Sequence, residues 1–433
     1  MLRIVERGTA DYADAIRQLR DRGRLDLERV EPEVRAILAS VRTGGDEAVR
    51  SWTRRFEGRE LDRLRLDDET WRARASSAPE ALRQALAEAA RRIRRYHELQ
   101  VERDRSLDEE GIELGLRIRP LASVGVYAPG GKARYPSSVL MCAVPAAVAG
   151  VPRIVLATPS PSPEVLAAAE IAGVTEVVDA GGAQAIAALA YGTESVEPVC
   201  KIVGPGNVWV ACAKRLVFGV VGIDQIAGPS EIVVVADGGA DSDVVAADLL
   251  SQAEHDEDAY PLLIATERAV ANAVCAALRD RLADLPRAAI ARASLERHGW
   301  ALVVGDLDEA IRLCNELGPE HLSLQVRNPQ AYLERVSVAG AVFVGDQTPE
   351  TAGDYAAGPS HVLPTGGAAR FGSPLGVWDF VTRTSVVRYD AAALARQATL
   401  LEALARAEGL EGHARAVRVR LGDRKGRTAP GSS

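Results

Sequence analysis

The chain has 433 residues, of which 47% are hydrophobic and 26% charged, and its formal net charge is −8. Because hydrophobic cores stop growing near about 250–300 residues, we expect several compact units, and the composition argues against disorder. The slightly acidic balance argues against a nucleic-acid or anionic-membrane partner.

Residues 1–118 form the first predicted segment, an N-terminal helical arm. Stretches such as APEALRQALAEAARRIRRYHELQ repeat apolar residues every three or four positions, as an amphipathic helix does. The charge run RRIRR is interpreted as a solvated helix face. The N-terminus lacks the apolar stretch of a secretory signal, and the long uncharged run YPSSVLMCAVPAAVAGVP is interpreted as protein interior, not a membrane span.

From residue 119 short Val/Ile runs alternate with Ala/Leu-rich helical stretches, a pattern typical of parallel strands with crossover helices. The first set of strands is expected in RIVLATP, EVVDAGG, CKIVGPGN and EIVVVAD, and the second in PLLIAT, ALVVGD, HLSLQV and AVFVGD. We therefore predict an α/β protein with two incomplete Rossmann-like halves, over residues 119–236 and 237–380.

Residues 381–433 form the last predicted segment, a C-terminal tail with one clear helix, AAALARQATLLEALARAEGL. The tail is too small to fold alone, so we expect it to dock on another surface, and its polar last ten or so residues are expected to be disordered. Five scattered cysteines without a C-x-x-C pair indicate reduced core residues of a cytoplasmic protein.

Glycine-rich turns follow several strands of the first half, in VYAPGGKARYP, DAGGAQAIA and VGPGNVW. Glycines let backbone N–H groups approach a phosphate at the helix N-terminus that comes next, so a nucleotide would fit there. A tight turn without a ligand remains the alternative for each of them, since the third glycine of the dinucleotide fingerprint is missing from GPGNVW.

The chain has only six histidines. His97 and His298 lie in charged, helical surroundings and are expected at the surface, whereas the other four lie in polar clusters. Gln252 and His255 are three residues apart, which would place both on one helix face. With Asp354 and His413 they could supply four nitrogen and oxygen ligands, a plausible set for Zn²⁺.

The stretch GPEHLSL places Glu320 beside His321 at the start of a predicted strand. Adjacent strand residues point to opposite faces, so both can serve one site only if the backbone bends, and Gly318-Pro319 favours a bend. Acid/base chemistry is one interpretation. The other is that Glu320 caps the turn while His321 packs.

Several long motifs occur in order along the chain: VGVYAPGGKARYPSSVLM, DAGGAQAIAALAYGT, KIVGPGNVWV, IDQIAGPSE, LLSQAEHD, GPEHL, TPETAGDYAAGPSHVLPTGGAARF and EGLEGHARAV. Through them the chain resembles the histidinol dehydrogenase family up to about residue 420. Ser360 stands where relatives often have Asn, and this difference affects none of the implied ligand or base positions.

The resemblance implies a role for each matched position. The implied NAD contacts are Tyr127, Gln184 and Asn207, and the implied ligands of one Zn²⁺ per subunit are Gln252, His255, Asp354 and His413. Substrate contacts would be Ser230, His361 and Glu408 together with His321 and the four zinc ligands. Glu320 and His321 match the catalytic pair. Glu408 and His413 would come from the partner subunit of a homodimer with shared active sites.

The resemblance also implies the reaction, the oxidation of L-histidinol to L-histidine through an aldehyde with two NAD⁺, the last two steps of histidine biosynthesis. We expect His321 to remove the hydroxyl proton and Glu320 to activate water for the second step. Alternatives are a dehydrogenase of the same family for another amino or sulfonated alcohol, a zinc-dependent hydrolase, and a nucleotide-binding regulatory protein.

Overall fold

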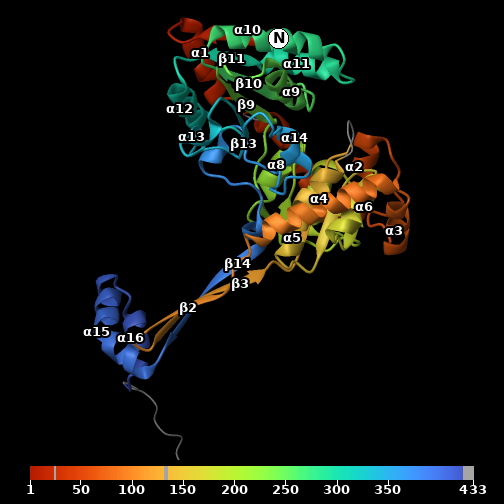
Figure 1. Ribbon diagram of the computed structural model, residues 1–433. Helices are drawn as coiled ribbons and strands as arrows, with labels where there is room; N and C mark the ends of the chain where they lie inside the picture. Colours follow the sequence, from red (N-terminus) through yellow and green to blue (C-terminus); the bar gives the residue numbers. More distant parts are fainter. Residues whose placement is uncertain (24–25, 131–134, 423–433) are drawn as a thin grey trace, which may run out of the picture. The chain divides into compact units, whose positions relative to one another are not determined.

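The computed structural model describes residues 1–23, 26–130 and 135–422, and the chain divides into two compact units (Figure 1). Unit 1 comprises Met1–Val101 and Leu121–Phe380, and unit 2 comprises Glu102–Pro120 and Val381–Ser433. The predicted disorder of the last residues, and the part of the first glycine turn at 131–134, lie outside the described residues.

Unit 1 contains a parallel six-stranded sheet whose central strand is buried along its whole length. The strand order is β1 (Arg3–Glu6), β11 (Trp300–Val303), β10 (Tyr260–Ala265), β9 (Glu231–Ala236), β12 (His321–Gln325) and β13 (Ala341–Val344). Ile232 and Val234 of β9 pack into one core cluster and Val233 and Val235 into another, so helices must cover both faces.

The helices of this half differ in which face they cover. The first cluster receives side chains from α9 (Ser242–Ala253), α10 (Arg268–Leu282) and α11 (Ala288–His298), and the second from α1 (Ala10–Arg20) and α12 (Leu307–Leu317). The short helices α13 (Pro329–Leu333) and α14 (Glu350–Tyr355) flank β13 in the sequence. The result is the layered α/β arrangement that a continuous Val/Ile strand predicts.

Unit 1 also contains a parallel five-stranded sheet of the same plan. Its order is β6 (Glu176–Val178), β5 (Ile154–Ala157), β4 (Val124–Tyr127), β7 (Lys201–Val203) and β8 (Gly222–Ile223). One face packs on α2 (Leu27–Glu57), α7 (Gly182–Tyr191) and α8 (Val208–Val217), and the other on α3 (Asp68–Ser76), α4 (Glu80–Glu98), α5 (Pro136–Val148) and α6 (Pro163–Ala172). Two short 3-10 helices, η1 (Ala368–Arg370) and η2 (Val377–Phe380), come late in the unit.

The α/β class with parallel sheets is confirmed, and every strand named from the sequence is present. The grouping of EIVVVAD with the first set of strands is wrong, because β9 lies between β10 and β12. The apolar run of β9 would suit either sheet, so only its pairing in the folded chain determines to which sheet it belongs. The placement of His97 at the surface is also wrong, since it is fully buried and its Nδ1 lies 2.8 Å from the Ile93 carbonyl oxygen.

Residues of the predicted helical arm are distributed over several structures: β1 joins the six-stranded sheet, α2–α4 cover the five-stranded sheet, and residues 105–120 belong to unit 2. The division of the chain into four domains, with boundaries after residues 118, 236 and 380, stays a prediction.

Unit 2 is built on an antiparallel three-stranded sheet in the order β14 (Val381–Tyr389), β3 (Ile112–Pro120) and β2 (Arg105–Glu109). Glu110 and Gly111, with φ of 51° and 84°, form the two-residue turn between β2 and β3, as the right-handed twist of a hairpin favours. The helices α15 (Ala391–Ala407) and α16 (Glu411–Arg420) pack together at one end of this sheet (Figure 1). The C-terminal tail and residues 105–120 therefore fold together as one unit.

Candidate active site

The expected nucleotide contacts lie around one cavity of about 720 Å³ at the carboxyl ends of β4, β5, β6 and β7. Tyr127, Gln184 and Asn207 all line it, together with the turn residues Gly181 and Gly182. The carboxyl edge of a parallel sheet is where α/β proteins bind nucleotides. Three turns that the sequence could assess only singly thus meet at one cavity.

Local contacts explain why these turns need their residues. The Gly182 N–H donates to the Tyr127 hydroxyl oxygen at 3.1 Å, and burial raises the pKa of Tyr127 to about 12, so it stays a neutral phenol. At Gly204, with φ of 116°, a Cβ would lie 2.1 Å from the Tyr127 carbonyl oxygen, which only glycine avoids. Asn207 caps α8 by accepting from two backbone N–H groups, and the buried Oε1 of Gln184 has no hydrogen-bond partner among the described residues.

The predicted catalytic pair, Glu320 and His321, lies at the amino ends of β9 and β12, opposite to the strand end at which a parallel sheet usually binds its ligand. Gly318 caps helix α12 after its last residue, Leu317, and its left-handed φ of 56° confirms the expected bend. Glu320 Oε2 then lies 3.7 Å from His321 Nδ1, and both side chains are buried. His321 Nδ1 is 2.9 Å from the Glu231 carbonyl oxygen. Because a carbonyl only accepts, Nδ1 carries the proton and Nε2 keeps its lone pair.

Burial separates the two members of the pair chemically. It lowers the pKa of His321 to about 4, so the imidazole is neutral at pH 7 and can accept a proton at Nε2. It raises the pKa of Glu320 well above its ordinary value, because burial disfavours the charged carboxylate. Burial thus favours the neutral form of both side chains, and the neutral imidazole is a base at pH 7.

Three of the four predicted metal ligands are brought together. Gln252 Nε2 lies 3.2 Å from His255 Nδ1, and His255 Nε2 lies 4.0 Å from Asp354 Oδ2. The placement of Gln252 and His255 on one helix face is wrong, because α9 ends at Ala253 and His255 follows in a turn. Gln252 Oε1 is buried and has no hydrogen-bond partner among the described residues, as expected of an oxygen reserved for a ligand.

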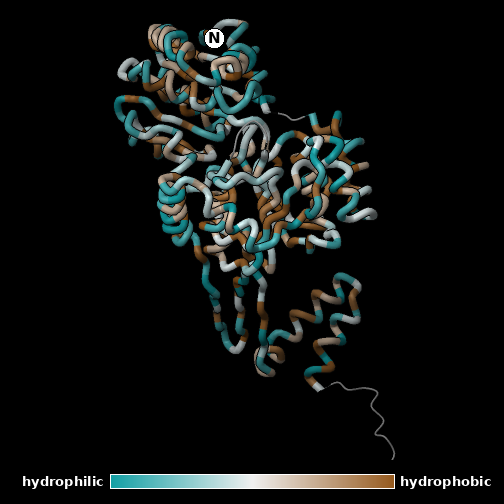
Figure 2. Tube along the Cα trace, turned by 90° about the vertical axis from the view of Figure 1, so that its right-hand side faces the viewer, coloured by the Kyte–Doolittle hydropathy of each residue, from teal (hydrophilic) through white to brown (hydrophobic). Residues whose placement is uncertain are grey.

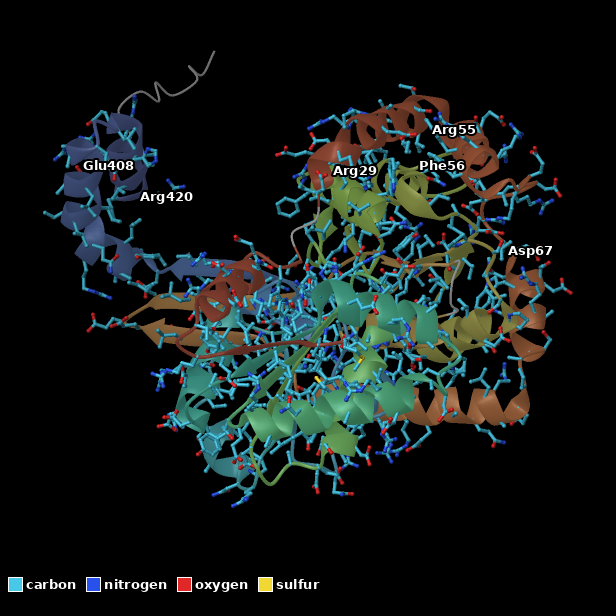
Figure 3. All side chains as sticks on the ribbon, turned by 90° about the horizontal axis from the view of Figure 1, so that it is seen from above. Arg29, Arg55, Phe56, Asp67, Glu408 and Arg420 are labelled. Atoms are coloured by element: carbon cyan, nitrogen blue, oxygen red, sulfur yellow. The ribbon has the colours of Figure 1, made fainter. Side chains whose placement is uncertain are left out.

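His361 completes this cluster, since its Nδ1 donates to the Asp354 carbonyl oxygen at 3.0 Å. Ser230 is half-buried and directly precedes β9. Glu408 and His413 belong to unit 2, at the end of α15 and in the first turn of α16, and both are exposed (Figure 3 labels Glu408). They are not among the unit 1 residues that converge.

Glu350 also lies in this cluster, although the sequence did not single it out. Its Oε1 lies 3.6 Å from His321 Nε2, and Ser251 Oγ donates to its Oε2 at 3.1 Å. Donor atoms of His321, Glu350 and Asp354 lie within 4.8 Å of one another. Burial, and then the charge of Asp354, raises the pKa of Glu350 to about 9, so Asp354 holds the negative charge and Glu350 the proton. The spacing of four between Glu350 and Asp354 on a helix was the available signal.

Over residues 1–23, 26–130 and 135–422, none of the helices has both the length and the hydropathy that a bilayer crossing requires.

Comparison with known proteins gives one consistent family. The family model described as histidinol dehydrogenase matches residues 20–421. The histidinol dehydrogenase of Gluconobacter oxydans is 51% identical over 403 residues, covering 92% of this chain and 94% of that protein. That of Aquifex aeolicus is 50% identical over 413 residues, covering 95% and 97%. The crystal structure of histidinol dehydrogenase from Elizabethkingia anophelis superimposes with a TM-score of 0.91 at 33% identity, over 97% of this chain and 98% of that chain. The chain therefore belongs to the histidinol dehydrogenase family of oxidoreductases.

Proposed function

We propose that the protein oxidises L-histidinol to L-histidine through the aldehyde, with NAD⁺ as the electron acceptor, in the last two steps of histidine biosynthesis. The observation that carries the proposal is the convergence of Gln252, His255 and Asp354 beside Glu320 and His321. Identity of about half with histidinol dehydrogenases over nearly the whole chain supports the same substrate.

A zinc ion fits the donor set of Gln252, His255 and Asp354. The set combines an imidazole, a carboxylate and an amide oxygen that is buried without a partner among the described residues, and nitrogen and oxygen donors of this kind suit Zn²⁺. Bound there, the cation would supply a Lewis acid that orients the amino alcohol, and its charge would lower the pKa of the nearby Glu320.

NAD⁺ fits the cavity that Tyr127, Gln184 and Asn207 line. The N-terminus of α7 has no side-chain cap, and Ala183 and Gln184 of its first turn line the cavity, so their N–H groups can bind the pyrophosphate. The indole of Trp209 and the ring of Phe56, whose centroids are 6.4 Å apart, offer apolar surface to the adenine (Figure 3 labels Phe56).

The proton transfers are assigned from the contacts of the pair. His321 Nε2, with its lone pair free, accepts the hydroxyl proton of histidinol as the first hydride leaves. Glu320, once deprotonated, activates water for attack on the aldehyde. His321, after it has released the first proton to solvent, accepts the proton of the hydrate as the second hydride leaves. The two oxidations and the hydration between them all need a proton acceptor at the same carbon, which explains why Glu320 and His321 are adjacent.

We further propose a homodimer in which Glu408 and His413 reach the site of the partner. Unit 2 leaves large apolar side chains exposed on its sheet and helices, and Figure 2 shows hydrophobic residues along both helices. The most exposed are Leu107, Val387, Leu400 and Leu404. A second copy of the chain would cover them. The five free cysteines suit a reducing compartment, and we place the protein in the cytoplasm.

The yield of NADH per histidinol tests the reaction. Two NADH per substrate are expected for the full oxidation, and one would mean that the reaction stops at the aldehyde. No NADH from histidinol, with hydrolysis of an ester or amide instead, would favour a zinc hydrolase.

Mixed dimers test the shared sites. His413→Asn and His321→Asn chains are each expected to be inactive, and refolding them together should restore about a quarter of the sites, since random pairing gives half mixed dimers with one intact site each. No recovery in dimers shown to be mixed would refute the sharing.

A further inference from the structure

We propose that Arg22 and Glu231 form a positioning pair that fixes the catalytic Glu320 and His321, an inference that rests on the function proposed above. Neither residue touches the cavity, and neither belongs to the cluster around Asp354. Their contribution would be the placement of the two groups that transfer protons.

Glu231 contacts both members of the catalytic pair. Its backbone N–H donates to Glu320 Oε2 at 2.8 Å, its side-chain Oε1 accepts from the Glu320 N–H at 3.1 Å, and its carbonyl oxygen accepts from His321 Nδ1 at 2.9 Å. Three bonds from one residue therefore determine the position of the Glu320 carboxyl group, its backbone, and the tautomer of His321.

The side-chain contact has a specific place in the sheet. The ladder between β9 and β12 begins with the pair Ile232 and His321, so Glu320 lies one residue beyond it. On the other side, the Ala341 N–H donates to the Glu320 carbonyl oxygen at 2.8 Å. The Glu320 N–H has only the Glu231 carboxylate as its partner among the described contacts, so this carboxylate extends the sheet by one bond.

Arg22 in turn holds the Glu231 carboxylate. Its guanidinium donates to both carboxylate oxygens, Nη2 to Oε1 at 2.8 Å, and also to the carbonyl oxygens of Leu19 at 2.9 Å and Leu317 at 3.0 Å. Both side chains of the ion pair are only 1% exposed. A planar fork with fixed donors on four acceptors leaves Glu231 one orientation, and a lysine cannot reproduce it.

The chain contains a matched pair elsewhere in unit 1. Arg153 donates to both oxygens of Glu176 and to the carbonyl oxygens of Glu197 and Pro198, the same pattern of four acceptors. It joins the region of β5 and β6 and, among the described residues, has no hydrogen bond or ion pair with Glu320 or His321. Arg153→Lys therefore removes the same kind of anchor without touching Glu320 or His321.

The experiment compares Arg22→Lys, Glu231→Asp and Arg153→Lys in the metal-loaded enzyme, with steady-state kinetics, metal content and thermal unfolding measured for each. We expect kcat to fall about 10–100-fold in the first two variants, because displacement of a catalytic group by about 1 Å costs on the order of 100-fold. The KM for histidinol and the metal content should stay within about twofold of wild type. Arg153→Lys should lower the unfolding midpoint and leave kcat unchanged.

Two outcomes would overturn the inference. One is a wild-type kcat in folded Arg22→Lys and Glu231→Asp, which would leave the pair a structural role only. The other is an equal loss of kcat in Arg153→Lys. Should Arg22→Lys fail to fold, Glu231→Asp still tests the pair, because it keeps the buried charges and withdraws only the carboxylate from Glu320. A wild-type enzyme without histidinol-dependent NADH would instead refute the proposed function.

Discussion

Replacement of Gly340 by alanine should reduce turnover by displacing the backbone of Glu320, which we propose to be catalytic. Gly340 follows the loop that runs beside Glu320, and its N–H donates to the Pro319 carbonyl oxygen at 2.8 Å. A Cβ at this position would lie 2.5 Å from the Glu320 carbonyl oxygen, about 0.9 Å closer than the 3.4 Å of an ordinary contact. The clash is with backbone, so a side-chain rotation cannot relieve it, and the backbones of Gly340 and Glu320 must move apart by about that amount.

A shift of about 1 Å at a reacting group costs on the order of 100-fold in rate, so we expect kcat for histidinol-dependent NADH formation to fall by about that factor. Gly222→Ala is the matched control, because its Cβ would meet no atom closer than 3.4 Å. Both variants should be assayed well below their unfolding midpoints. A folded Gly340→Ala enzyme with wild-type kcat would refute the argument that the backbone beside Glu320 has no room to move.

Three further predictions concern the metal, the second oxidation and stability. Gln252→Leu should lower zinc affinity by more than the ~10–100-fold that loss of an outer contact costs, and chelation should abolish activity until zinc returns. Elemental analysis of dialysed protein checks both predictions. Full zinc content in the dialysed variant would contradict the role of Gln252 as a ligand. Glu320→Gln keeps an oxygen for the Glu231 N–H yet loses the base, so histidinal oxidation should fall more than histidinol oxidation in single-turnover assays. Equal losses would contradict the division of labour. Burial lowers the pKa of His97 below the unfolded value of about 6.5, so the unfolded chain binds the extra proton and stability should be lost as pH falls below about 6.5. His97→Gln should reduce the difference in unfolding midpoint between pH 7.5 and 5.5, and an unchanged difference would show that His97 does not cause it.

The sequence predicts the parallel sheets well because their strands are short, continuous Val/Ile runs whose burial on both faces leaves a clear mark. The adjacency of Glu320 and His321 likewise needs no tertiary information. Unit 2 is different. Its strand β14, VTRTSVVRY, mixes apolar, hydroxyl and charged residues without regular alternation, and Val387 is mostly exposed, so the strand lacks the pattern of a covered sheet.

The residues that hold the site could not be found in this way. Arg22 lies in a stretch with many arginines, and nothing local distinguishes the one that becomes buried. Glu231 reads as the polar flank of an apolar strand. Arg22 is 209 residues from Glu231 and 295 residues from Leu317, so only the folded chain reveals these contacts.

The pairing of β3 with β14 has a consequence for synthesis of the chain. Nine residue pairs, from Ile112 with Tyr389 to Pro120 with Val381, join segments separated by residues 121–380. At about 5–20 residues per second, a ribosome releases β3 tens of seconds before its neighbour exists. Throughout that interval the nascent hairpin presents an open edge to other chains, and a product truncated before Val381 would keep that edge permanently as a point of aggregation.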